Sequence, residues 1–159
     1  MADVASGAGV SRQTLYQEFG AKQALGAALT ERRGLNTVAA LRELTARPGT
    51  GIGDAVAFLL DRAGADPVLR ATLTATAGPR LPPLLPAHCI RLLVTAREVL
   101  ADLLAQGVPA PRPGAAGIAA EAALRLVSSQ LLVPVVADAR FCDDVAGLVA
   151  GYLRASSPG

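Results

Sequence analysis

Few side chains in this sequence have the type and spacing that catalysis or metal binding requires. The chain holds one histidine, His88, and two cysteines, Cys89 and Cys142, without a CxxC pair or a histidine at metal-ligand spacing. His88 and Cys89 are neighbours, and adjacent side chains on a helix diverge by about 100°. A single histidine without a nucleophile motif does not assemble a catalytic site. We therefore expect no metal, no cofactor and no enzyme activity, with a small helical enzyme as an alternative.

The polar side chains that could recognise a partner are concentrated in one stretch, GVSRQTLYQEFGAK, residues 9–22. It contains two of the chain's five aromatic residues and its only lysine, whereas most of the remainder is alanine, leucine, valine and arginine. The net charge of the chain is +2, and the segment up to Arg47 carries six basic and four acidic residues. The remainder holds nine of each sign. The positive excess thus lies in the segment with this stretch, which weakly indicates a polyanionic partner.

Composition favours an all-α protein, either one domain or a small module of a larger chain. Hydrophobic residues make up 52% and aromatic residues 3% of the 159 residues, so the core must be mainly aliphatic. Alanine and leucine favour helices, and β-branched residues are too scattered for successive strands. Every long apolar run is interrupted before the roughly 20 residues that cross a bilayer, and no secretory signal is recognisable. We expect a soluble cytoplasmic protein without a membrane segment.

Helix start and stop signals divide the chain into about eight segments, beginning with two short helices. The first should cover residues 2–8 and end at Gly9, which suits a left-handed conformation. Ser11 should cap the second helix, because its hydroxyl can accept from the free amides at the helix start. That helix should run to Phe19 and end at Gly20.

A third and longer helix is expected from Ala21 to Ala46, before a break at residues 47–51 that contains proline and glycine. The candidates for its buried side are Leu25, Leu29, Val38 and Leu41. Further helices are expected over residues 53–64, 66–77, 87–105, 115–132 and 143–155, with connections at 78–86, 106–114 and 133–141. The helix over 87–105 has a wide apolar face, formed by Ile90, Leu93, Val94, Val99, Leu100, Leu103 and Leu104, and should be central to a bundle.

Residues 2–19 have the pattern of a helix-turn-helix, with Ala5 inside the first helix, Gly9 in the turn and Leu15 inside the second. Alone this pattern is weak, because alanine and glycine are abundant in the chain. The longer segment ADVASGAGVSRQTLYQEFGAKQAL, residues 2–25, closely resembles the DNA-binding segment of tetracycline-repressor-type (TetR) transcriptional regulators. It shares with them an AGVS turn, a recognition helix with a TLYxxF core, a small residue, a lysine and an apolar helix.

The resemblance implies an all-α fold in which a helix-turn-helix DNA-binding segment is followed by an α-helical ligand-binding and dimerisation bundle. Residues 1–46 would form the DNA-binding region with its connecting helix, and residues 47–159 the ligand-binding and dimerisation domain. It further implies a homodimeric repressor that binds a double-stranded DNA operator and responds to a small molecule. The ligand would stabilise a different spacing of the two recognition helices.

The resemblance also assigns DNA contacts to individual residues. The expected DNA-binding residues are Ser11, Arg12, Gln13, Thr14, Tyr16, Gln17 and Lys22. Ser11 would cap the recognition helix, whose amide end can face a phosphate. The side chains at positions 12, 13, 14 and 17 would reach base edges in the major groove, while Tyr16 and Lys22 would contact the DNA backbone. Leu15 and Phe19 should face inward, and Arg32 and Arg33 should form a solvated helix face.

Dimerisation is assigned by the resemblance to the last two helices. The apolar residues expected at this interface are Leu124, Leu131, Val145, Leu148, Val149 and Tyr152, some of which could instead pack within the chain. A sensing region is expected between Gly53 and Leu104, and its aliphatic lining indicates a small apolar ligand. Phe58, His88, Arg91 and Arg97 fall in this region but are better explained by a packed bundle, so no ligand-binding residue is assigned.

Members of the family carry a further helix ahead of this motif, whereas nothing precedes Met1 here. Without it, Val4, Leu15, Phe19 and Leu25 would lose part of their cover, and burial of each such side chain is worth about 1.5–3 kcal/mol. Two explanations are open. The native start lies upstream, which we favour because the DNA-contacting residues are intact, or the chain is a truncated ligand-binding and dimerisation protein with little or no DNA binding.

Overall fold

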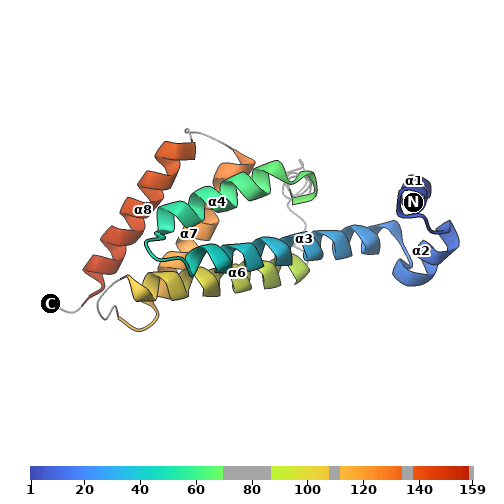
Figure 1. Ribbon diagram of the computed structural model, residues 1–159. Coiled ribbons are helices and arrows are strands. Elements are labelled where there is room, and N and C mark those ends of the chain that lie inside the picture. Colours follow the sequence, from blue (N-terminus) through green and yellow to red (C-terminus); the bar gives the residue numbers. More distant parts are fainter. Residues whose placement is uncertain (70–86, 108–111, 134–137, 158–159) are drawn as a thin grey trace.

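The computed structural model describes residues 1–69, 87–107, 112–133 and 138–157, and the regular elements among them are all helices. They are α1 (Ala2–Ala8), α2 (Arg12–Phe19), α3 (Lys22–Thr45), α4 (Ile52–Ala65), α6 (Ala87–Gln106), α7 (Ala115–Leu132) and α8 (Asp138–Ala155). Figure 1 shows α1 and α2 as a small head at one end of α3, with the other helices bundled around the opposite half of α3. The predicted all-α fold, with a helix-turn-helix followed by a bundle, is confirmed.

The two turns of the head form where the glycines predict them. Gly9 ends α1 with a φ of 66°, and Gly20 ends α2 with a φ of 67°. Residues with side chains rarely adopt such angles, so glycine is the natural stop signal at both positions. Inside the head, Ala5 of α1 and Leu15 of α2 are buried, and Phe19 is half-buried.

Helix α3 is one continuous helix of 24 residues that joins the head to the bundle. Its second half enters the core through Val38 and Leu41, as predicted. Its first half carries less cover: Leu25 is half-buried, and Leu29 is 41% exposed, so the prediction that Leu29 is buried was wrong. The pattern of leucines in the sequence does not reveal where the bundle stops covering the helix.

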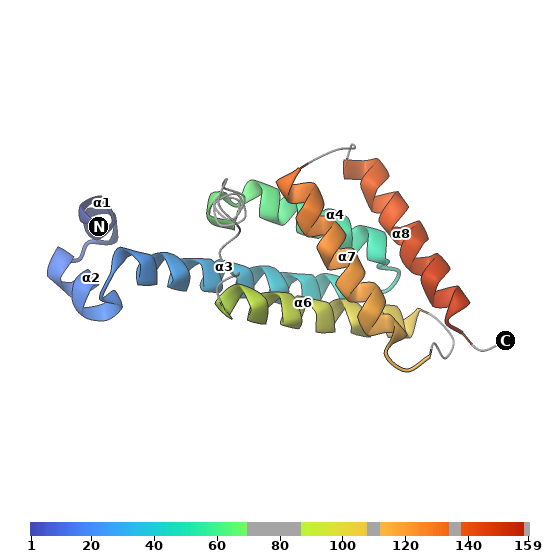
Figure 2. The ribbon, with the colours of Figure 1, turned by 180° about the vertical axis from the view of Figure 1, so that it is seen from behind.

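The core lies where the second half of α3 meets α4, α6, α7 and α8, and Figure 2 shows α7 and α8 beside α4 and α6 from behind. The larger aliphatic side chains in it include Leu41, Val56, Leu60, Val99, Leu100, Val127, Val145, Val149 and Leu153. On α7, the buried positions 115, 119, 120 and 123 are all alanine, which lets neighbouring helices approach closely. The aliphatic core expected from the low aromatic content is therefore present.

Helix α6 is central to the bundle only in its second half. Val99, Leu100, Leu103 and Leu104 are buried, but Ile90, Leu93 and Val94 in the first half are exposed. The wide apolar face predicted for residues 87–105 is therefore buried only in its second half, and the central position expected for this helix does not hold for its first turns. Helix α6 packs tightly against α3 at Gly34, where an added Cβ would collide with the Leu92 side chain.

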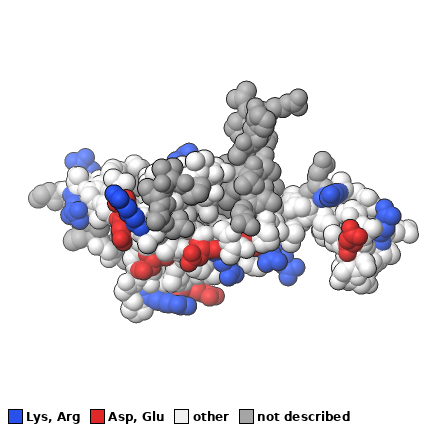
Figure 3. Space-filling model, turned by 90° about the horizontal axis from the view of Figure 1, so that it is seen from above, with Lys and Arg blue, Asp and Glu red and all other residues white. Residues whose placement is uncertain are grey.

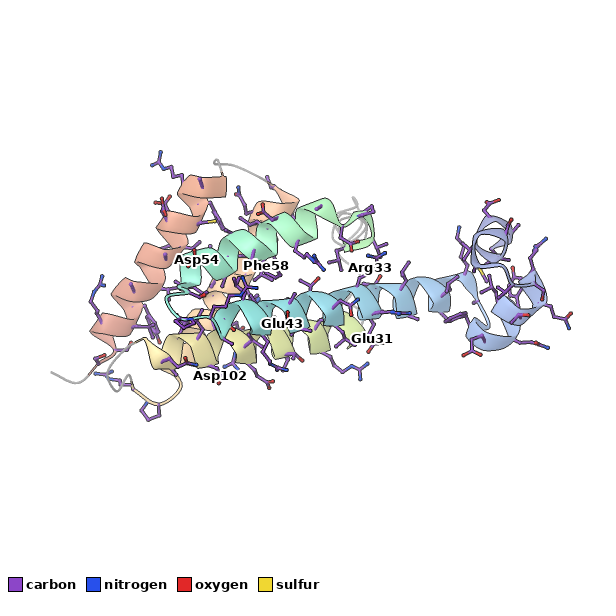
Figure 4. The ribbon with its side chains drawn as sticks, in the orientation of Figure 1. Glu31, Arg33, Glu43, Asp54, Phe58 and Asp102 are labelled. Atoms are coloured by element: carbon purple, nitrogen blue, oxygen red, sulfur yellow. The ribbon has the colours of Figure 1, made fainter. Side chains whose placement is uncertain are left out.

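The break between α3 and α4 is also built from the predicted residues. Gly49 has a φ of 82°, and the Thr50 hydroxyl donates to the Leu44 carbonyl oxygen at 3.0 Å. The Gly51 N–H donates to Asp54 Oδ2 at 2.8 Å, which places a carboxylate at the positive end of α4. Asp54 is labelled in Figure 4. These bonds satisfy backbone groups that the two helix ends leave open.

Two other helix boundaries were expected from the sequence. The Asp66 carboxylate accepts from the backbone N–H of Val68 at 2.8 Å and of Leu69 at 3.2 Å, so a helix does begin after Asp66. Its predicted continuation to Ala77, the connection at 78–86 and most of the connection at 106–114 lie outside the described residues. Helix α8 begins at Asp138 rather than at the predicted Asp143, because residues 138–141 are already helical.

Among the described residues, no helix is long and apolar enough to cross a membrane.

Replacing Leu41 by alanine should destabilise the protein by about 2–5 kcal/mol, because a fully buried leucine loses its packing and leaves a cavity. Leu35 on the same helix is 52% exposed, and its replacement by alanine is the matched control, with an expected loss below about 1 kcal/mol. Urea unfolding followed by circular dichroism measures both values. Equal losses in the two variants would contradict the placement of α3 in the core.

Candidate nucleic-acid interface

Helix α2 begins at a hydrogen-bonded cap. The Thr14 backbone N–H donates to Ser11 Oγ at 3.0 Å, and Ser11 Oγ lies 2.8 Å from Thr14 Oγ1. A serine at this position satisfies one of the amides that a helix start leaves free. The predicted cap at Ser11 is therefore present, and the hydroxyl of Thr14 is held against it rather than extended.

One side of α2 is buried and the rest of its side chains are exposed. Leu15 and the half-buried Phe19 are four residues apart and form the covered side of α2, a helix that contacts α1 and α3. At 3.6 residues per turn, Gln13 and Gln17 lie on the opposite side of the helix. All the side chains predicted to bind DNA are exposed, namely Ser11, Arg12, Gln13, Thr14, Tyr16, Gln17 and Lys22. The structure thus brings the predicted residues onto one accessible segment.

The charges of the head are balanced rather than uniformly positive. Its two basic residues, Arg12 and Lys22, are accompanied by Asp3 and Glu18. Figure 3 shows basic and acidic side chains near one another on the head, at the right of the view. Neither Arg12 nor Lys22 forms an ion pair with the part of the chain that the structure describes. Both are exposed cations without an acidic partner there.

Two ion pairs fix the middle of α3 to the bundle, and neither was predicted. Glu31 Oε1 lies 2.5 Å from Arg91 Nη2 of α6, and Asp66 Oδ2, after α4, lies 3.7 Å from Arg33 Nη1. Figure 4 shows Glu31 on the side of α3 toward α6 and Arg33 on the side toward the end of α4. Arg33 was expected on a solvated face, and its side chain is 54% exposed but paired. The partners are distant in sequence, so no local pattern announces them.

The predicted dimer residues divide into buried and exposed groups. Leu124, Val145 and Val149 are buried in the core of their own chain, as the alternative of packing within the chain expects, and Leu131 is half-buried against the same core. Leu148 and Tyr152 of α8 are exposed. Ile118, Leu126 and Leu132 of α7, and Val133 directly after it, are exposed apolar residues that the sequence analysis did not name. Their spacing places them near one face of the helix, but spacing alone does not tell an exposed apolar face from a buried one.

Polar groups in the expected sensing region are engaged with their own chain. Arg91 forms an ion pair with Glu31. The guanidinium of Arg97 packs against Gly117. The Nε atom of Arg97 is buried and forms no hydrogen bond with the described residues. Arg125 lowers the pKa of Glu121 through a hydrogen bond and through its positive charge, and the positive charge of Arg97 lowers the pKa of Glu121 further. Phe58 is half-buried, while the side chain of His88 lies outside the described residues. The described part of the chain holds no cluster of metal-ligating side chains.

The arrangement of a capped, polar helix on a head, a long connecting helix and a helical bundle agrees with the family comparisons. Residues 1–29 match the bacterial regulatory proteins of the tetR family, and residues 48–151 match the C-terminal domain of the bacterial tetracyclin repressor. The chain belongs to the TetR family. The resemblance identified in residues 2–25 is thereby confirmed and extends over most of the chain.

Two relatives of this TetR-family chain cover nearly all of it. The HTH-type transcriptional regulator AlkX of Mycobacterium tuberculosis (strain ATCC 25618 / H37Rv) is 28% identical over 156 residues, which are 96% of this chain and 74% of the relative. The crystal structure of the TetR family repressor AlkX from Dietzia sp. strain DQ12-45-1b, implicated in biodegradation of n-alkanes, is 27% identical, with a TM-score of 0.67. The match covers 99% of this chain and 87% of that one. The chain is accordingly a DNA-binding transcriptional regulator of the TetR family and not an enzyme.

Replacing Ser11 by alanine should destabilise α2 by about 1 kcal/mol, because the Thr14 amide loses its acceptor. Hydrogen exchange of the amides in residues 12–19 measures the change locally. Ser129 of α7 is exposed, and none of its side-chain atoms forms a hydrogen bond within the described residues, so its replacement by alanine is the control. Unchanged exchange in α2 after the Ser11 substitution would contradict the role of the cap.

Proposed function

We propose that the protein is a homodimeric transcriptional repressor that reads an operator with α2 and releases it when a small apolar ligand binds. The observation that carries the proposal is the capped α2, whose polar side is exposed while Leu15 holds its other side in the head. Such a helix can enter the major groove without rearrangement of its backbone. Because a regulator must reach DNA, we place the protein in the cytoplasm.

In this proposal the residues of the head have separate roles at the DNA. Gln13 and Gln17 lie farthest from the buried side of α2 and make base contacts, since glutamine can bond bidentately to adenine. Arg12 and Thr14, near the helix start, contact bases beside them, and the capped amide end at Ser11 faces a phosphate. The exposed Tyr16 and Lys22 contact the DNA backbone, which fixes the position of the head without reading sequence.

A homodimer is proposed because α7 and α8 carry exposed apolar residues at helical spacing. Ile118, Leu126 and Leu132 recur along α7, and Leu148 and Tyr152 lie on α8. Exposed apolar surfaces of this kind commonly mark contacts between proteins. A two-fold dimer would place two α2 helices about 34–36 Å apart, which is one helical turn of DNA.

The ligand response is proposed to act through α3, because this helix is anchored in the bundle and carries the head. The Glu31–Arg91 and Arg33–Asp66 ion pairs connect α3 to two different parts of the bundle. A ligand that binds one arrangement of these parts better shifts the population of head spacings. The aliphatic composition of the bundle supports an apolar ligand, as does a solved relative implicated in biodegradation of n-alkanes.

Lys22→Ala should weaken operator binding broadly and reduce the salt slope of binding by about 1 per protomer, because one phosphate contact is lost. Tyr16→Phe should also weaken binding at all sequences, through loss of its hydroxyl. Gln17→Ala should instead relax sequence preference by about 1–3 kcal/mol at one position of the site, with an unchanged salt slope. Titrations of a duplex selected by the protein from a random pool, at several salt concentrations, separate these effects.

The control for the charge change is Arg32→Ala, since Arg32 is exposed on α3 and forms no ion pair with the described residues. It should leave both the affinity and the salt slope within experimental error. An unchanged slope for Lys22→Ala would argue against its phosphate contact. A slope change as large for Arg32→Ala would show that the effect belongs to net charge rather than to the head.

One observation favours a second candidate function, a helical ligand-binding and dimerisation protein with little DNA binding. The head buries only two apolar side chains among its described residues, those of Ala5 and Leu15, while Val4 and Val10 are exposed. The burial of two side chains contributes little to the free energy of unfolding of the head, and domains are stable by only a few kcal/mol in total. Failure of the purified dimer to select any duplex would favour this candidate over the repressor.

Glu31→Arg and Arg91→Glu should each lower operator affinity by up to about fivefold. Either change replaces an attraction of about 1 kcal/mol between α3 and α6 by a repulsion between like charges, which frees α3 from α6. The double exchange restores opposite charges and should recover most of the affinity. Arg125→Glu, which breaks a pair within α7 alone, is the matched control and should have no effect on DNA binding. Equal losses in the double exchange and the single variants would contradict coupling through this pair.

A further inference from the structure

The part of α3 nearest the head is weakly covered by other helices. None of the described side chains from Lys22 to Leu29 is buried, whereas Thr30, Val38 and Leu41 farther along the helix are buried. Figures 1 and 2 show this stretch crossing from the head to the bundle with no other described helix alongside it. We call residues 22–29 the arm of α3. Where packing by other helices is absent, the helical state depends on the intrinsic preferences of the residues themselves.

The two glycines inside α3 differ in what the packing requires of them. At Gly34 an added Cβ would collide with the Leu92 side chain of α6, so the close contact between the two helices requires glycine. At Gly26, in the arm, an added Cβ would meet no described atom within 4 Å, and φ is not positive. Glycine favours the helical state about fivefold less than alanine does. Neither packing nor backbone geometry thus explains Gly26, which weakens the arm.

A hydrogen bond one turn later weakens the same part of the helix. The Thr30 hydroxyl donates to the Gly26 carbonyl oxygen at 3.0 Å. A bond of this kind competes for the carbonyl that receives the backbone N–H in the helix, and it often bends helices. Thr37 forms the equivalent bond to the Arg33 carbonyl oxygen, but there the bundle covers the helix. Two weakening features therefore coincide in one turn at the edge of the arm.

We propose that residues 26–30 are a flexible joint in α3, at which the helix opens or bends so that the head adjusts its position on DNA. The joint lies between the head and residues 31–34, where Glu31, Arg33 and Gly34 hold α3 to the bundle. Motion at the joint consequently moves the head and leaves the bundle unchanged. Because the joint is helical in the structure, a displacement of the bundle still reaches the head.

The joint gives Gly26 a role in operator specificity, and this part of the inference rests on the proposed function. A dimer with rigid arms accepts one spacing of its two half-sites, whereas a joint in each arm lets the heads follow a changed spacing. A different explanation is that Gly26, one turn after Lys22, leaves room for the DNA backbone. The two explanations differ in whether the glycine matters at every spacing or only at altered ones.

Hydrogen exchange of the full chain tests the joint without DNA. Local opening predicts that the amides of residues 27–31 exchange faster than those of residues 38–44, and that Gly26→Ala slows only the first group, about fivefold. Ala28→Gly, at an exposed position of the arm, should speed the same amides about fivefold. Ala39→Gly is the matched control, since Ala39 is exposed on the half of α3 that the bundle holds. It should speed amides that exchange through global unfolding and leave residues 27–31 unchanged.

Binding to altered operators tests the consequence for DNA. A duplex selected by the protein from a random pool is compared with duplexes that have one base pair inserted or removed between the half-sites, which rotates one half-site by about a tenth of a turn. Gly26→Ala should keep its affinity for the original duplex and bind the altered ones about fivefold more weakly for each head that has to adjust. Ala28→Gly should reduce the loss at altered spacings, and Ala39→Gly should leave it as in the unchanged protein.

The outcomes separate the joint from the proposed function. Equal exchange rates in residues 27–31 and 38–44, or an effect of Gly26→Ala that spreads over both groups, would overturn the joint. A loss of affinity for Gly26→Ala that is the same at every spacing would show that the glycine makes room for DNA, and would also overturn it. A protein that selects no duplex would overturn the proposed function and the role of the joint at DNA, while the exchange contrast still decides whether α3 opens there.

Discussion

The burial of the second half of α3 is the interaction on which the rest of the molecule depends. Val38 and Leu41 enter the core, while the contacts of α1 and α2 with the described residues are with each other and with α3. The position of the head is therefore determined by one helix. Because a helix transmits displacement along its length, a small shift where Leu41 packs would move the head, and in the proposed mechanism the Glu31 and Arg33 ion pairs bias that shift. This is why proposed sensing and proposed DNA binding can be coupled without direct contact.

Stability is distributed unevenly along this helix. At the bundle end, five of the described helices share an aliphatic core, whereas the described side chains buried in the head are those of Ala5 and Leu15. The head should consequently open more readily than the bundle. In a DNA-binding protein, contacts with the operator can order such a head. The same low stability makes the head sensitive to loss of the Ser11 cap.

Local chemistry in the sequence was a good guide wherever the cause was local. Gly9, Ser11 and Gly20 predicted the head because turn and cap preferences depend on neighbouring residues, and the segment 2–25 identified the family. Which apolar side chains are buried by other helices was predicted less well. Leu29, Ile90 and Val94 are apolar but exposed, and Leu124, Val145 and Val149 were assigned to an interface but are buried in the chain's own core. A helix can present apolar residues on more than one side, and periodicity alone does not say which side meets which neighbour. The ion pairs of α3 join residues far apart in sequence, so no local pattern could indicate them.

The central claim is that two α2 helices of one dimer read two successive turns of DNA. Hydroxyl-radical footprinting of the purified protein on a duplex that it selects from a random pool tests this directly. The account predicts two protected patches on one face of the duplex, with centres about 10–10.5 base pairs apart or a whole multiple of this spacing. A single patch, patches on opposite faces of the duplex, or no protection at protein concentrations that give a full dimer would contradict it.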